Sequence, residues 1–251
     1  MLTLTALTSG AIWLVILILS VASLIGAVRG WQPVASRQLT LTGYGFYDFH
    51  YATGDIGGGA LILDWQAAPA FRLSVGAEYA SSNRIAAKLC GQATLFTSSA
   101  GGRLALENSY LFRHFPSLNL QEFTGALQVA WYARHVNLHL GLCNRYIAEL
   151  IQRSNGGIGT VFEPMNVMFA AEGWWNNQLG ASPWNVGLRW SNYNDFIVER
   201  VANWFFSAKA TYRLPNQTTF VAEAGIHPVG SLNLTASYDG WFLHLGATKQ
   251  L

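Results

Sequence analysis

Apolar and polar residues alternate along most of this chain, and almost every charged residue falls in the polar phase. In the segment 70–80 the apolar phase is Phe71, Leu73, Val75, Ala77 and Tyr79, and the polar phase is Arg72, Ser74, Gly76 and Glu78. Successive side chains of a β-strand point to opposite faces, so such a segment has one apolar face and one polar face. The pattern recurs about a dozen times with turn residues between, as in a transmembrane β-barrel.

The composition agrees with a large apolar outer surface. Of the 251 residues, 51% are apolar and only 11% are charged, whereas charged residues make up about a quarter of a typical soluble protein. Aromatic residues reach 14%. The net charge of +2, without any basic run, argues against nucleic acid as a partner. The length suits one large all-β domain.

The one long uninterrupted apolar run spans residues 11–27. It is about as long as the shortest helix that spans a membrane. We interpret residues 1–36 as a signal peptide, with small residues suited to cleavage after Ala27 or Ser36. Because no Lys or Arg precedes the run, an uncleaved anchor is the alternative. Residues 37–251 are then expected to form the barrel.

Thirteen segments alternate well enough to be candidate strands. They are 40–51, 58–66, 70–80, 84–96, 102–113, 119–132, 135–147, 160–174, 183–191, 203–213, 218–227, 230–238 and 241–249. Bacterial single-chain barrels have even strand numbers, and about 215 mature residues allow about 18 per strand and turn. We therefore predict twelve strands and keep fourteen as the alternative. The last two candidates are separated by Asp239-Gly240, a strong hairpin signal. The weakest alternation is in 40–51 and 160–174, where we expect the miscount.

The connections and the aromatic residues predict how the barrel sits in a membrane. Short turns at 66–69, 133–134 and 214–217 fall at one end of the strands, and longer connections at 148–159 and 192–202 fall at the other. In outer-membrane barrels the short turns face the periplasm. Aromatic residues gather near the ends of the apolar face, as in an interfacial girdle. They are Trp65, Tyr79, Tyr110, Phe112, Trp131, Tyr146, Trp184, Trp190, Trp204 and Tyr212.

With a signal segment, amphipathic strands and aromatic strand ends, the chain resembles bacterial outer-membrane β-barrel proteins across residues 40–251. The resemblance is to the class and to no specific family. Many members end in an aromatic residue, whereas this chain ends in Leu251. The resemblance implies an outer-membrane location with membrane lipids around the barrel.

The polar phase places charged residues inside the predicted barrel. Nine are basic, namely Arg72, Arg84, Lys88, Arg103, Arg113, Arg145, Arg189, Lys209 and Arg213, and six are acidic, namely Asp64, Glu78, Glu107, Glu122, Glu172 and Glu223. The side chains predicted to line the lumen are Arg72, Arg84, Lys88, Arg103, Glu107, Arg113, Glu122, His135, His139, Arg145, Arg189 and Lys209. They either line a channel that weakly prefers anions, or pair across the barrel and fill it, because a twelve-stranded interior is narrow.

The chain contains no complete set of residues for catalysis or metal binding. Cys90 and Cys143 lie on the polar phase of strands three apart, and we expect two thiols rather than a disulfide. His135 and His139 are four residues apart on one strand, about 13 Å, which is too far to share a metal ion. Residues 153–156 resemble the His-x-Ser-Asn-Gly stretch of outer-membrane acyl hydrolases, but Gln152, two residues before Ser154, stands where the base would be.

We therefore predict a porin-like passive channel for small hydrophilic solutes, without enzymatic activity, metal or cofactor. The main alternative is a structural or surface-interaction barrel with a blocked lumen. An outer-membrane lipid-modifying enzyme is the third possibility.

Overall fold

The computed structural model describes residues 38–50, 54–81, 83–98, 101–116, 119–149, 159–176, 183–198, 203–229 and 238–251. The predicted signal segment 1–36 lies outside these residues. Within the described ranges, no helix is long and apolar enough to span a membrane.

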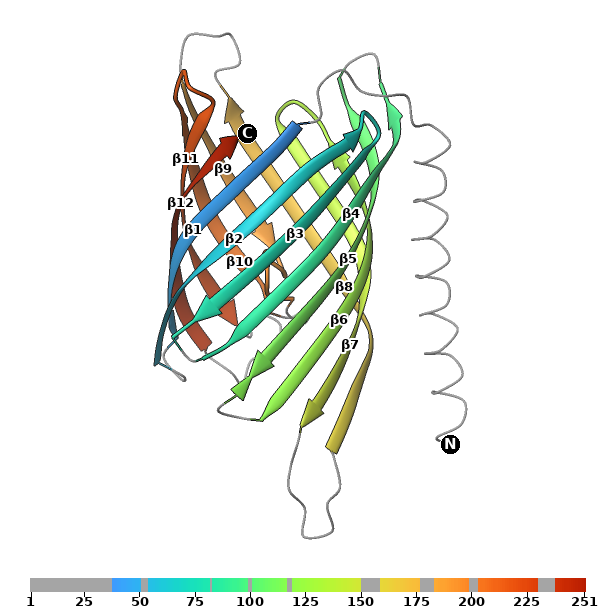
Figure 1. Cartoon of the computed structure of the whole chain (residues 1–251), viewed down its shortest axis with the longest axis vertical. Coiled ribbons are helices and arrows are strands. Elements are labelled where there is room, and N and C mark those ends of the chain that lie inside the picture. Colours follow the sequence, from blue (N-terminus) through green and yellow to red (C-terminus); the bar gives the residue numbers. More distant parts are fainter. Residues whose placement is uncertain are drawn as a thin grey trace.

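The described residues form twelve antiparallel strands that close into a barrel (Figure 1). The strands are β1 (Gln38–His50), β2 (Gly54–Ala68), β3 (Phe71–Ala80), β4 (Ile85–Thr97), β5 (Arg103–Phe115), β6 (Leu120–Tyr132), β7 (Val136–Glu149), β8 (Gly159–Asn176), β9 (Trp184–Ser191), β10 (Phe205–Arg213), β11 (Thr218–Val229) and β12 (Tyr238–Gln250). Each strand pairs with the next in sequence, and β12 pairs with β1. The predicted all-β barrel of twelve strands is confirmed.

The predicted hairpin at Asp239-Gly240 is wrong. Both residues lie inside β12, where Gly240 is paired with His227 of β11 and with His50 of β1. Pairing of β12 along both of its edges outweighs the local preference of Asp-Gly for a turn. Of the candidate strand 230–238, residues 230–237 lie outside the described residues.

The expectation that the miscount lies at 40–51 or 160–174 is also wrong, because these segments form β1 and β8. Their alternation is weak for local reasons. β1 carries Gly43 and Gly45 among its interior positions, and the pairing of β7 with β8 shifts between Cys143 and Arg145. Pairing with neighbouring strands maintains both segments despite these irregularities.

The two faces of the wall follow the predicted phases. Leu89 and Val186 lie on the outer surface with 45% and 46% of their area exposed, whereas Gln92, Glu107 and Glu122 are buried on the inner side. An exposed apolar outer face and a polar inner face are the reverse of a soluble protein, and they match a barrel surrounded by hydrocarbon.

The three longest connections, after β7, β9 and β11, lie at one rim of the barrel, which also carries short connections after β1, β3 and β5. The turns after β2, β6 and β10 are short, and they lie at the same end as Leu251, whose amide donates to the carbonyl of Leu39. We call this end the short-turn rim and the opposite end the loop rim. At the short-turn rim the rings of Trp184 and Tyr212 are 4.7 Å apart on the outer face. This is the arrangement expected of aromatic residues at a membrane interface.

Candidate functional site: the barrel lumen

Residues 192–198, which follow β9, leave the wall and enter the barrel; we call them the inner loop. Asn192 anchors its start, because its side-chain amide accepts from the Phe169 amide at 2.8 Å and donates to the Val167 carbonyl at 2.7 Å. The Asn194 side chain then accepts from the amides of Phe196 and Ile197 at 2.9 and 2.8 Å. These bonds hold a compact turn inside the lumen.

Phe196 seats the inner loop against the opposite wall. Its side chain is fully buried, and a Cβ placed on Gly76 would lie 2.9 Å from its ring. A side chain larger than that of glycine at position 76 would therefore displace the ring. Around Phe196 an apolar cluster joins the inner loop to small and medium inward-facing residues. The cluster contains Ala60, Ala86, Leu111, Ala126, Cys143, Met168, Ala170, Tyr193, Phe196 and Val198.

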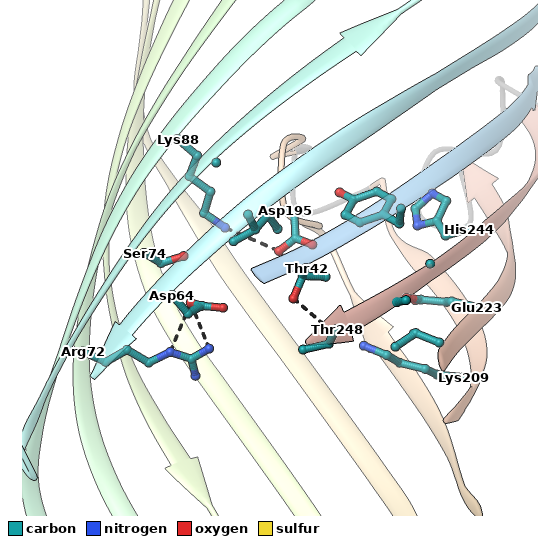
Figure 2. A pocket seen from close by; sticks show the side chains of 16 residues that line it. Thr42, Asp64, Arg72, Ser74, Lys88, Asp195, Lys209, Glu223, His244 and Thr248 are labelled. Atoms are coloured by element: carbon teal, nitrogen blue, oxygen red, sulfur yellow. Dashed lines mark hydrogen bonds and ion pairs between the residues drawn. The ribbon is translucent and has the colours of Figure 1, made fainter. Parts of the chain in front are cut away.

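Polar contacts add to this apolar seat. The Lys88 ammonium lies 3.7 Å from the Asp195 carboxylate (Figure 2). Arg189 donates to the Tyr193 carbonyl at 3.0 Å, and Arg145 donates to the Val198 carbonyl. These contacts hold the inner loop to β4, β7 and β9.

Much of the predicted lumen charge is paired within the wall. Arg113 holds Glu122 with two bonds of 2.6 and 2.7 Å, and both side chains are almost fully buried. Arg84 donates to one oxygen of Glu78 from Nη2 at 2.6 Å and from Nε at 2.9 Å. Arg145 also approaches Glu122, at 3.3 Å. Buried pairs of opposite charge such as these present little net charge to a passing ion.

A second group of inner side chains surrounds Glu107, which is 6% exposed. Its carboxylate accepts hydrogen bonds from Gln92, Tyr132 and Gln128, the last at 2.8 Å, and His139 lies 3.6 Å away. Arg103 stacks on the Tyr132 ring at 4.6 Å. Between β8 and β9, Arg189 pairs with Glu172 at 3.5 Å. The contacts of Glu107 fix its carboxylate as part of the wall.

A polar cavity of about 280 Å³ remains between the inner loop and the walls of β1–β4 and β10–β12. Figure 2 shows its labelled side chains: Thr42, Asp64, Arg72, Ser74, Lys88, Asp195, Lys209, Glu223, His244 and Thr248. Arg72 pairs with Asp64 at 2.9 Å, yet 43% of its side chain stays exposed. Lys209 is not ion-paired with any carboxylate in the part of the chain that the structure describes, and lies 6.0 Å from the Trp174 ring centre.

The predicted lining residues thus fall into different environments. Arg72, Lys88 and Lys209 border the cavity, whereas Arg84, Arg113, Glu122, Arg145, Arg189, Glu107, His139 and Arg103 take part in the wall contacts described above. His135 differs from the prediction, because it lies in the exposed turn before β7 and its ring meets the Trp174 carbonyl at 3.3 Å. The geometry of a turn, which breaks the alternation, explains this displacement.

No group of three metal-ligating side chains occurs among the described residues. Cys90 and Cys143 are not joined by a disulfide, as expected from their strands. The sequence interpretation missed the inner loop, which it treated only as a long connection. One available signal was the presence of Tyr193, Phe196 and Val198 within that connection, since large apolar residues are unusual in a solvated loop.

No protein-family model matches the chain, and no curated protein matches it. Several solved structures do. An outer-membrane channel from Pseudomonas putida F1 is 9% identical, with 88% of this chain and 98% of that chain covered and a TM-score of 0.50. The translocator domain of the autotransporter NalP from Neisseria meningitidis is 12% identical, covering 93% and 95%, with a TM-score of 0.49.

The KdgM porin in complex with disordered oligogalacturonate is 11% identical, covering 83% and 98%, with a TM-score of 0.47. At such identities the likeness concerns the fold. The Pseudomonas putida structure, at a TM-score of 0.50, and the closed antiparallel barrel itself give the chain the fold of bacterial outer-membrane β-barrels, and the class-level resemblance inferred from the sequence is confirmed.

Proposed function

We propose that this chain is a passive channel of the bacterial outer membrane for small hydrophilic solutes. The observation that carries the proposal is the polar cavity inside a barrel whose outer face is apolar. A bilayer would surround the outer face, and water would fill the charged interior. The partners on this proposal are membrane lipids outside and small solutes inside, with no cofactor.

The cavity supports weak charge selectivity. Three basic side chains, Arg72, Lys88 and Lys209, border it together with three acidic ones, Asp64, Asp195 and Glu223. The larger basic excess predicted from the sequence does not reach the cavity, because Arg84 and Arg113 are bound to buried carboxylates. Selectivity in such a pore depends on the charges that face the water. We therefore propose a smaller preference for anions than the number of interior basic residues suggests.

A closed structural barrel is the second candidate, and the inner loop favours it. Phe196 is fully buried inside the lumen, and the cluster around it joins β2, β4, β5, β6, β7 and β8. A loop held in this way narrows any path through the barrel. On the channel proposal it forms the constriction, whereas on the alternative it closes the lumen permanently.

Enzymatic activity is not part of the proposal. The similar structures reported above are channels, a porin and a translocator domain rather than enzymes. The carboxylate most surrounded by polar groups, Glu107, is engaged by glutamine, tyrosine and histidine side chains of the wall. A buried carboxylate with all these partners is suited to fixing neighbouring strands.

Single-channel recording of the purified full chain in planar bilayers tests the proposal. We expect discrete current steps from the wild type, and a reversal potential close to zero in a salt gradient because the cavity charges balance. Folding is checked by the different gel migration of unheated and heated protein. Folded wild type and folded Phe196→Ala that both lack current steps would refute the channel and leave the closed barrel.

A further inference from the structure

An apolar groove of about 1,030 Å³ lies on the outer surface of β6–β9. Its walls include Trp131, Leu138, Leu140, Phe169, Trp190 and Trp204. His139 also borders the groove, but its ring pairs with Glu107 and Tyr132 on the inner side of the wall. The outward side chains that line the groove are therefore all apolar.

The groove lies where two successive outward positions of β8 hold small residues. Ala171 pairs with Leu138 on one side and with Trp190 on the other, so a methyl group lies between two large side chains. Two residues further, the outward position is Gly173, and a Cβ built there would meet no atom within 4 Å. Ala171 therefore forms the floor of the groove, and the larger side chains on β7 and β9 form its walls.

The position of the groove determines what can occupy it. It lies within the exposed apolar face, where Leu138 and Leu140 are 48% and 63% exposed. Apart from the indole N–H groups of its tryptophans, the outward side chains of the groove offer no hydrogen-bonding group, so a charged ligand would lose its hydration there without compensation. We propose that the groove binds one acyl chain of a membrane lipid along β8. This inference goes beyond the proposed channel activity and does not depend on it.

Two tryptophans of the groove wall also flank the connection between β9 and β10, which contains the inner loop. Trp190 precedes Asn192, and Trp204 precedes β10. Their rings are 5.7 Å apart, and the Phe169 ring lies 4.8 Å from that of Trp190. The backbone of Phe169 is bonded to Asn192. An acyl chain in the groove would therefore contact the side chains that frame the departure of the loop from the wall.

Tryptophan fluorescence offers a direct test, since Trp131, Trp190 and Trp204 line the groove. The folded full chain in short-chain detergent micelles is titrated with phosphatidylcholine that carries a dibrominated stearoyl chain, which quenches nearby tryptophans. We expect saturable quenching at low lipid-to-protein ratios. Ala171→Phe, which fills the floor, should weaken this binding by about tenfold or more, because every methylene group of the acyl chain that the ring excludes weakens binding several-fold.

Two further variants control the experiment. Ala87→Phe adds the same ring to the outer face of β4, where Ala77 and Phe112 flank position 87, and should bind like the wild type. Gly173→Leu adds a side chain at the next outward position after Ala171, where a Cβ meets no atom within 4 Å, and should weaken binding in the same direction if Ala171→Phe misfolds. Linear quenching that is equal in all variants overturns the proposal, as does an unquenched wild type. A dimer seen by size-exclusion chromatography that lipid does not dissociate would also overturn it, because a second copy would then occupy the groove.

Discussion

Replacement of Phe196 by alanine should release the inner loop. The fully buried ring fills a socket over Gly76, and removal of a buried phenylalanine side chain destabilises packing by about 3–5 kcal/mol. At about 1.4 kcal/mol per factor of ten, the lower figure raises the ratio of undocked to docked loop by about 100-fold. The variant should spend more time in a state of higher single-channel conductance than the wild type.

The charged contact of the same loop should matter less. Asp195 and Lys88 are 3.7 Å apart, and 51% of the Asp195 side chain is exposed to the cavity. Pairs of this exposure contribute about 0–1 kcal/mol, so Asp195→Asn should change the same ratio by at most about fivefold. Phe196→Ala should therefore undock the loop more than Asp195→Asn does, because the Phe196 ring is buried and the Asp195 carboxylate is half exposed.

Phe220→Ala is the matched control, because Phe220 is 51% exposed on the outer face of β11. It removes the same ring without touching the lumen, and its conductance should equal that of the wild type. The reasoning fails if Phe196→Ala and Phe220→Ala give the same traces, or if Asp195→Asn opens the channel more than Phe196→Ala does.

Three more outcomes are expected. Arg113→Glu places a second carboxylate beside the buried carboxylate of Glu122 and should lower the free energy of unfolding by about 3–5 kcal/mol, measured by urea titration. A smaller loss than the same substitution causes at an exposed arginine would contradict the buried pair. Lys209→Glu reverses the cation that has no ion pair at the cavity and should move the reversal potential toward cation preference, with little change in stability. Leu89→Arg on the lipid face should destabilise the barrel by about 2–4 kcal/mol if the site is near the bilayer midplane, whereas Cys90→Arg on the inner face should do so less; equal effects would refute the face assignment.

The alternation of side chains predicted most of the fold, because hydrocarbon and water on opposite faces impose a period of two on every spanning strand. The hairpin prediction failed because a local signal competed with pairing. Asp239-Gly240 favours a hairpin by itself, but Gly240 lies in register with a residue on each neighbouring strand, inside β12. A single sequence does not show which neighbours a strand will have, so the two influences could not be weighed.

The lumen was less predictable, since its contacts join residues that are far apart in sequence. Phe196 rests on Gly76, and nothing near either position indicates the other. The pair Arg113–Glu122 lies across a single hairpin, yet its register depends on where β5 ends and β6 begins. The phase of each strand separates the charged residues from the apolar ones, but it gave no information on which charges neutralise one another.

The apolar cluster beneath the inner loop contains a cysteine whose reactivity can report whether the loop is docked. The thiol of Cys143 belongs to that cluster and its residue is only 2% exposed, whereas Cys90 on the inner wall of β4 is partly accessible. A water-soluble alkylating reagent can reach Cys143 only during the intervals in which the loop has left its seat, so the rate of modification reports the population of that open form. The ratio of the alkylation rates of Cys143 and Cys90, measured by mass spectrometry, then reports the fraction of undocked loop in an unlabelled barrel. Cys90 serves as the internal reference for the reactivity of the reagent.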